Sequence, residues 1–308
     1  MNNRLRKHLE AAKALQEQFR TASESENFAQ SLAASSLDSH VDELNSFLAA
    51  EEYRPVIELV DFRINAPGLE HGAMPLGLLA KATNEIRKMI GHAALRLSEG
   101  GLRKHRVPNE LYSFLNLRLV GILPGSTRLL VAADSHRDLF DDGIAKHALE
   151  RIFAVLYSGG EGQEFLEAIS ELGVSSTRQL RNFLHLLRDN GAEIDLLWKY
   201  AGAEAASWHG SSSAISAVTT ALDLAELTES DDIELEGVIE LLSKRERINL
   251  KLPSGEGIRI LYPRRLLPQV SELHLDQRVN LMCRVMQTSN PNTGEATTSY
   301  ELLEILKS

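Results

Sequence analysis

The chain has 308 residues, of which 43% are hydrophobic and 25% are charged, and its formal net charge is −10. These values are typical of a globular protein of about two domains and exclude wholesale disorder. No apolar run approaches the roughly 18 residues that cross a bilayer, and the N-terminus lacks a secretory h-region, so we expect a cytoplasmic protein without a membrane partner. The single cysteine, Cys283, excludes an intrachain disulfide and a Cys-x-x-Cys site, and its alternating surroundings predict a buried strand thiol.

Residues 1–52 are predicted to form a helical N-terminal segment, a short hairpin of two helices. Apolar residues recur at helical spacing from Leu5 to Phe19 and again from Val41 to Leu48, with Ser and Asp caps between the two stripes. We expect the first stripe to cover the protein's own sheet. The alternative is that it binds a partner or forms a homo-oligomer.

Residues 53–228 are predicted to form a mixed α/β domain, in which helices cover an antiparallel or mixed sheet. Pro124 and Gly125 suit the centre of a type II turn and predict a β-hairpin around them. Strands are expected at 53–64, 111–122, 127–135 and 192–200, and helices at 74–97, 141–158, 161–173, 175–191 and 211–227.

The acidic segment 226–237 is interpreted as a boundary, with a second domain at 231–308. Strand-like segments follow at 232–243, 247–253, 257–263, 278–288 and 297–306, with room for a helical turn between the third and the fourth. This order resembles the oligonucleotide- or oligosaccharide-binding barrel, with the SH3-like barrel as the alternative. The predicted fold class is therefore α+β, ending in a small five-stranded β-barrel-like domain.

Two short segments, "GAMPLGLL" at 72–79 and "LPGSTRLLV" at 123–131, carry a further resemblance. They are similar to segments of uncharacterised bacterial proteins that combine an α/β body with a C-terminal small β-domain. The resemblance implies no catalytic activity. It favours a part in a bacterial multi-component system, with a sensor or adaptor of phage defence or of a toxin–antitoxin operon as one alternative.

The common catalytic signatures, including the phosphate-binding and nucleophile-elbow motifs, are absent from the sequence. The enzyme alternative is a metal-dependent hydrolase or nuclease that uses Asp134, His136 and Asp138. The competing interpretation is structural, because Asp141 and Asp142 are placed to cap the helix that follows. We expect no cofactor.

Other histidines and tryptophans are expected to be structural or surface residues. Arg178 and His185 have the spacing of a ribonuclease motif, but about two such matches arise by chance, so the match is not evidence. Trp198 is predicted to lie in a buried strand. Trp208 and His209 are predicted to lie in a loop.

A basic segment stands out against the acidic chain. Residues 243–285 hold nine basic and four acidic residues, a net charge of +5. In the segment 247–252, basic and polar residues alternate with apolar ones, so the polar set is expected to share one face of a strand. The candidate binding residues are Lys244, Arg245, Arg247, Lys251, Arg259, Arg264 and Arg265.

Three interpretations of this basic face remain open. It contacts nucleic acid or an acidic protein partner, it is only the solvated face of a sheet, or it docks on an acidic body of its own chain or of a second copy. The first interpretation predicts a protein that works by binding or assembly and not by catalysis.

Overall fold

The computed structural model describes residues 10–15, 37, 41, 58–67, 74–101, 106–123, 127–133, 143–243 and 246–306. Most of the predicted N-terminal hairpin lies outside these residues, although residues 10–15 are helical as expected. None of the helices described there is long and apolar enough to cross a membrane.

The chain divides into two compact units, each formed by segments that are distant in sequence. Unit 1 consists of Met1–Leu76, Asn116–Asp134 and Gly191–His209; unit 2 consists of Gly77–Leu115, Ser135–Asn190 and Gly210–Ser308. Most of the described helices and the barrel thus belong to unit 2, and the first sheet belongs to unit 1. The domain boundaries drawn from the sequence stay a prediction.

Unit 1 is built on an antiparallel sheet around the central strand β1. Alternate residues of β1 are buried, among them Val60, Phe62 and Ile64, because successive side chains of a strand point to opposite faces. The predicted hairpin of β2 and β3 is confirmed, while its turn lies outside the described residues. In the order β2-β3-β1-β4-β5 the strands are β1 (Glu58–Asn65), β2 (Arg118–Leu123), β3 (Thr127–Ala133), β4 (Glu193–Tyr200) and β5 (Ala203–Gly210).

Trp198 of β4 belongs to the core of this sheet, as predicted. It is 3% exposed, and its indole N–H donates a hydrogen bond of 2.5 Å to the buried carboxylate of Glu58 on the neighbouring strand. The bond satisfies the one polar atom of the indole, which buried tryptophans require.

Two elements differ from the sequence prediction. A short helix at Asn109–Leu115 occupies the first part of the strand expected at 111–122. The next residue, Asn116, has a φ of 43°, a left-handed conformation that asparagine tolerates. Strand β5 was read as a loop. It pairs with β4 through a two-residue turn in which Ala201 and Gly202 both have positive φ, the geometry of a type I′ hairpin.

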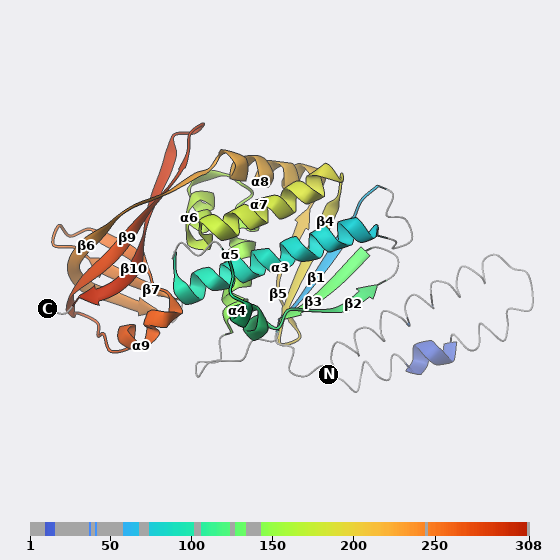
Figure 1. Cartoon of the computed structure of the whole chain (residues 1–308), viewed down its shortest axis with the longest axis horizontal. Helices are drawn as coiled ribbons and strands as arrows, with labels where there is room; N and C mark the ends of the chain where they lie inside the picture. Colours follow the sequence, from blue (N-terminus) through green and yellow to red (C-terminus); the bar gives the residue numbers. More distant parts are fainter. Residues whose placement is uncertain are drawn as a thin grey trace, which may run out of the picture. The chain divides into compact units, whose positions relative to one another are not determined.

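Unit 2 combines six helices of the described part with a closed barrel (Figure 1). At the start of α5, Gly143 holds the N-cap position, and none of the described side chains caps this end. Ser211, in contrast, caps α8 by accepting a hydrogen bond of 3.2 Å from the backbone N–H of Ala214. The helices are α3 (Leu76–Glu99), α4 (Asn109–Leu115), α5 (Ile144–Tyr157), α6 (Gly162–Leu172), α7 (Val174–Asp189) and α8 (Ser212–Leu224).

The predicted five-stranded barrel is confirmed. Its strands follow the closed order β10-β8-β7-β6-β9, with β8 and β10 parallel and the other described pairs antiparallel. This connectivity, with η2 (Arg264–Leu266) and α9 (Leu267–Val270) between the third and fourth strands, is that of the oligonucleotide-binding type and not of the SH3-like alternative. The strands are β6 (Glu226–Ser243), β7 (Arg247–Lys251), β8 (Gly257–Leu261), β9 (Arg278–Asn290) and β10 (Glu295–Leu306).

Apolar side chains from every strand and from α9 fill the barrel, including Leu250, Ile260, Val270, Cys283 and Leu302. Strand β6 begins at Glu226, so the acidic segment that was read as a boundary is the first part of a barrel strand. It pairs with the last part of β9.

Candidate binding site on the barrel

The outer face of β7 and β8 carries the basic residues that the sequence predicted to lie together. Along β7, Arg247, Asn249 and Lys251 are partly or fully exposed, whereas the intervening Ile248 and Leu250 are buried in the barrel. The register places Asn249 beside Arg259 of β8, so the polar set continues across both strands. The predicted alternation is confirmed.

Two of these arginines are paired with carboxylates of helix α6 in the same unit. The Nη2 atom of Arg247 lies 2.9 Å from both carboxylate oxygens of Glu171. Arg259 lies farther away, with its Nη1 atom 3.7 Å from Glu167 and 3.8 Å from Glu171. The interpretation that the basic face docks on an acidic surface of its own chain therefore holds for Arg247 and Arg259.

The other described candidate residues also have partners within the chain. Lys251 pairs with Glu240 at 3.3 Å and Arg264 with the buried Glu246 at 2.9 Å. Arg265 donates a hydrogen bond of 3.2 Å to the backbone oxygen of Glu99. Lys244 and Arg245 lie outside the described residues.

The barrel as a whole is acidic, so the prediction of a basic small domain is wrong. With β6 included, residues 226–306 hold nine basic and fourteen acidic residues, so the barrel has a net charge of −5 and not a positive one. The range 243–285 has a positive net charge because it contains only the last residue of β6, a strand that contributes seven acidic residues up to residue 242. A positive charge of the barrel as a whole no longer supports binding to an anion.

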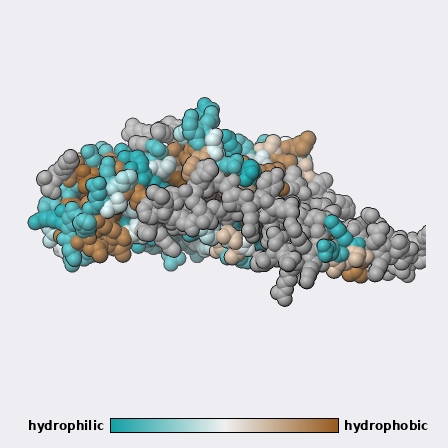
Figure 2. Space-filling model, turned by 90° about the horizontal axis from the view of Figure 1, so that it is seen from below, coloured by the Kyte–Doolittle hydropathy of each residue, from teal (hydrophilic) through white to brown (hydrophobic). Residues whose placement is uncertain are grey.

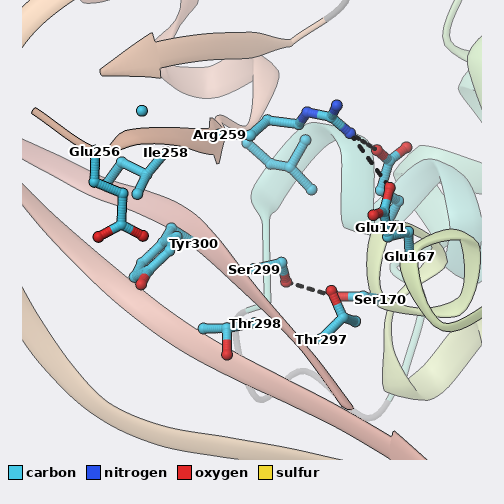
Figure 3. Close-up of a pocket in the computed structure, with 12 residues that line it drawn as sticks. Glu167, Ser170, Glu171, Glu256, Ile258, Arg259, Thr297, Thr298, Ser299 and Tyr300 are labelled. Carbon is cyan, nitrogen blue, oxygen red and sulfur yellow. Dashed lines mark hydrogen bonds and ion pairs between the residues drawn. The ribbon is translucent and has the colours of Figure 1, made fainter. Parts of the chain in front are cut away.

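A pocket of about 320 Å³ lies between α6, β8 and β10, beside the basic face (Figure 3). It exists because β8 and β10 pair at only two positions, Ile260 with Tyr300 and Leu261 with Glu301, so the preceding residues of the two strands do not pair with each other. Its lining is polar, with three glutamates, one arginine and several hydroxyl groups: Glu167, Ser170, Glu171, Glu256, Gly257, Ile258, Arg259, Leu261, Thr297, Thr298, Ser299 and Tyr300.

A hydrogen bond joins two hydroxyl groups of the pocket lining. The hydroxyl groups of Ser170 on α6 and Ser299 on β10 are 2.5 Å apart and point toward each other (Figure 3). The pocket is of a size that holds small ligands or a few residues of a peptide. Ser170, Ser299 and Tyr300 were missed as site residues because no local sequence signal shows that α6, β8 and β10 meet.

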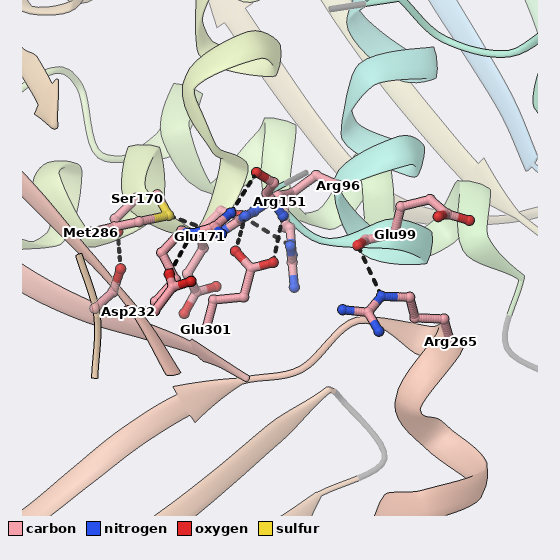
Figure 4. Close-up of polar contacts among 12 residues, drawn as sticks. Arg96, Glu99, Arg151, Ser170, Glu171, Asp232, Arg265, Met286 and Glu301 are labelled. Atoms are coloured by element: carbon pink, nitrogen blue, oxygen red, sulfur yellow. Dashed lines mark hydrogen bonds and ion pairs between the residues drawn. The ribbon is translucent and has the colours of Figure 1, made fainter. Parts of the chain in front are cut away.

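A buried ionic cluster joins the helices of unit 2 to the barrel (Figure 4). The Arg96 guanidinium of α3 is bound to the Glu301 carboxylate of β10, and their side chains are 9% and 4% exposed. Glu301 also accepts a hydrogen bond from the backbone N–H of Gly101. Arg96 makes a further contact of 3.0 Å to the sulfur of Met286 on β9.

Arg151 of α5 extends this cluster. Its Nη1 atom donates a hydrogen bond of 3.0 Å to the backbone oxygen of Glu171. Burial lowers the pKa of Arg151 to about 10, against the opposing effect of the Glu171 and Glu246 carboxylates. The guanidinium therefore remains charged at neutral pH, and the cluster holds a network of paired charges and not an isolated one.

The thiol of Cys283 points into the barrel core and is predicted to be unreactive. Burial, and secondly the Glu301 carboxylate, raise the pKa of this thiol to about 12. Because only the thiolate reacts, about one thiol in ten thousand is reactive at pH 8. We expect iodoacetamide at pH 8 to leave Cys283 unmodified in the folded protein and to alkylate it in urea, as seen by intact mass. Rapid modification without urea would contradict this buried environment.

The candidate metal ligands Asp134, His136 and Asp138 lie outside the described residues, as do Asp141 and Asp142. Within the residues that are described, no group of three or more His, Cys, Asp or Glu side chains is placed to hold a metal ion. The metal-dependent enzyme stays an untested prediction.

The remaining aromatic and histidine candidates are placed as follows. Trp208 and His209 lie in strand β5 and not in a loop, because this segment pairs with β4. The Nδ1 atom of His209 is 2.6 Å from the carboxylate of Asp195, and this hydrogen bond raises the pKa of the imidazole. Tyr262 is buried, and its hydroxyl donates a hydrogen bond of 2.8 Å to the backbone oxygen of Ser243. The aromatic residue that lines the pocket is Tyr300.

No protein-family model matches this chain, and a comparison with curated proteins finds no match.

Proposed function

We propose that this is a non-catalytic binding or assembly protein, and that its barrel takes up an extended segment of a protein partner in the pocket between β8 and β10. The observation that carries the proposal is the two-residue pairing of these strands, beyond which they separate beside a pocket of about 320 Å³. Strand edges that lack a neighbour can pair with an added peptide, which is a common mode of recognition.

The charges around the pocket favour a polypeptide over a nucleic acid. Three glutamates and one arginine line it, so its own side chains carry a net charge of −2. Arg259 is already paired with two of those carboxylates. Phosphates would meet this negative charge, whereas a neutral or basic peptide would find hydroxyl groups, carboxylates and backbone partners.

The surface of the barrel supports polar recognition in the same way. On the face seen in Figure 2, hydrophobic residues at the barrel end form small areas between hydrophilic ones. A partner that binds there gains more from hydrogen bonds and shape than from one large apolar contact.

Filling the pocket is expected to block the partner. Gly257 lines the pocket, and the nearest atom to a Cβ at this position is 3.9 Å away, so Gly257→Trp adds bulk without a backbone clash. A photo-crosslinking residue placed at Thr298 in the full chain is expected to give a discrete protein adduct in cells, and Gly257→Trp is expected to abolish it.

Gly77→Trp is the matched control, because a Cβ at Gly77 meets no atom within 4 Å and Gly77 lies in α3, outside the pocket. The adduct should persist in this control. An adduct that survives Gly257→Trp, or one formed with nucleic acid, would contradict a protein site in the pocket.

The wider setting rests on the sequence alone. A bacterial multi-component system, phage defence, a cytoplasmic location and a homo-oligomer are parts of the same proposal. They are supported by the sequence resemblance and composition described above.

A further inference from the structure

Helix α7 carries a row of basic side chains that the barrel proposal does not use. Arg178, Arg181, His185 and Arg188 are separated by three, four and three residues, which places them along one side of an α-helix. At a rise of about 1.5 Å per residue the row extends for about 15 Å. The single carboxylate of α7, Asp189, is its last residue, at the far end of the row.

One carboxylate from helix α8, that of Asp223, is the partner of two of the four residues in this row. Asp223 lies 2.9 Å from Nε2 of His185 and 3.8 Å from Nε of Arg181. Arg188 donates to Nδ1 of His185 at 2.7 Å. Arg178 is exposed and has no hydrogen-bond or ion-pair partner among the residues described, so the row holds more positive charge than Asp223 neutralises.

Helix α3 adds Lys88, which forms an ion pair with Glu85 at 3.0 Å, and the unsatisfied imidazole of His92 beside the start of the row. The two helices approach there, since a Cβ on Gly173, just before α7, would be 3.1 Å from Cδ of Arg96. His92 of α3 is 8% exposed, and its Nδ1 atom has no hydrogen-bond partner in the described part of the chain. Burial first, and then the charges of Lys88 and Arg178, lower the pKa of this imidazole.

The geometry points to a nucleic-acid-binding face on unit 2, formed by the row on α7 together with Lys88, that contacts the phosphate backbone. Arginine is suited to this contact because its planar guanidinium donates two parallel hydrogen bonds to a phosphate. One strand of a duplex carries a phosphate about every 3.4 Å of the helix axis, so a row of about 15 Å parallel to that axis spans the rise of about four phosphates.

The regular spacing is what favours nucleic acid over an acidic protein. A phosphate backbone presents charges at a constant interval, and side chains three and four residues apart on a helix do the same. The face has few apolar residues for a protein interface, since the buried side of α7 (Leu180, Phe183, Leu184 and Leu187) is turned inward.

The test is binding of the full chain to labelled 20-mer single-stranded RNA and duplex DNA at several salt concentrations. We expect Arg178→Gln/Arg181→Gln to weaken binding at 50 mM salt. The plot of log affinity against log salt should become less steep by about 1.4 to 1.8, because each of the two lost phosphate contacts accounts for about 0.7 to 0.9 of its slope. Arg247→Gln/Arg259→Gln in the barrel is the matched control and should leave both quantities unchanged.

A second readout does not depend on affinity. Two-dimensional NMR of the imidazoles should show the pKa of His92 rising when nucleic acid binds, because the bound phosphates offset the cations that lower it. Arg178→Gln should raise the same pKa in the free protein, for the same reason and with the fold preserved.

Three results would overturn the inference. One is no binding of either probe at 50 mM salt. Another is nucleic-acid binding that Arg247→Gln/Arg259→Gln abolishes while Arg178→Gln/Arg181→Gln leaves it intact. That result would place the nucleic acid on the barrel and would also contradict the proposed peptide site in the pocket. The third is displacement of the probes by polyglutamate as effectively, per charge, as by unlabelled RNA, which would make the face a site for acidic proteins.

Discussion

Replacing Glu301 by alanine is expected to lower the free energy of unfolding by about 3 to 5 kcal/mol, the usual loss when one member of a buried ion pair is removed. The reason is that Arg96 would remain charged with a side chain only 9% exposed, and the N–H of Gly101 would lose its acceptor. Urea unfolding of the full chain, followed by far-ultraviolet circular dichroism, measures the change.

The matched control for this prediction is the double variant Arg96→Met/Glu301→Leu. Replacing both charges by apolar groups removes the buried unpaired guanidinium, so the double variant should be more stable than Glu301→Ala. A loss below about 1 kcal/mol in Glu301→Ala would show that water or another carboxylate satisfies Arg96, and that the cluster does not hold the barrel to the helices.

Gly237→Val should destabilise the protein by about 3 kcal/mol or more, because it forces a side chain into the wall of the barrel. A Cβ at Gly237 would lie 2.6 Å from the backbone oxygen of Lys251 and 2.7 Å from Cγ of Leu250. Strand β6 pairs with β9 as far as Val238 and with β7 from Val238 onward, so Gly237 lies where the strand passes close to both neighbours. Thermal unfolding and urea titration would both report the loss.

Gly257→Val is the comparison, since it also introduces a branched residue at a strand glycine of the barrel. The nearest atom to its Cβ is 3.9 Å away, so we expect stability within about 0.5 kcal/mol of the original protein. Equal losses in the two variants would mean that valine is unfavourable at either position for a reason other than the close approach of β6 and β7.

The two proposed surfaces belong to the same compact unit and differ in chemistry. The charged residues that line the pocket beside β8 and β10 are three glutamates and one arginine. The face on α7 has three arginines, and α8 places one carboxylate beside them. If both proposals hold, the protein connects a protein partner to a nucleic acid. Because the variants that test them share no residue, one proposal can fail without the other.

Several features of this protein could be predicted from the sequence. Alternation of apolar and polar residues along 247–252 predicted the inner and outer faces of β7, because that period is a local property of a strand. The five barrel strands and the helical turn after the third were predicted for the same reason. The spacing of three, four and three residues that forms the row on α7 is also visible in the sequence.

Local patterns failed where pairing with a distant segment decides the structure. Strand β5 is rich in alanine, which is not typical of strands, and it forms because β4 supplies a partner through a tight turn. The helix at 109–115 has a composition that suits a strand equally well, and the left-handed Asn116 ends it.

The sequence by itself determined the α+β class, the succession of five barrel strands along the chain, and which residues of β7 face inward and outward. Only the tertiary structure decided the charge of the barrel and the partners of its arginines. Strand β6 closes the barrel and brings its acidic residues into it, while α6 places Glu171 beside Arg247 across 76 positions of sequence. Charge acts through distance in space, so a count along the chain cannot show which charges neutralise one another.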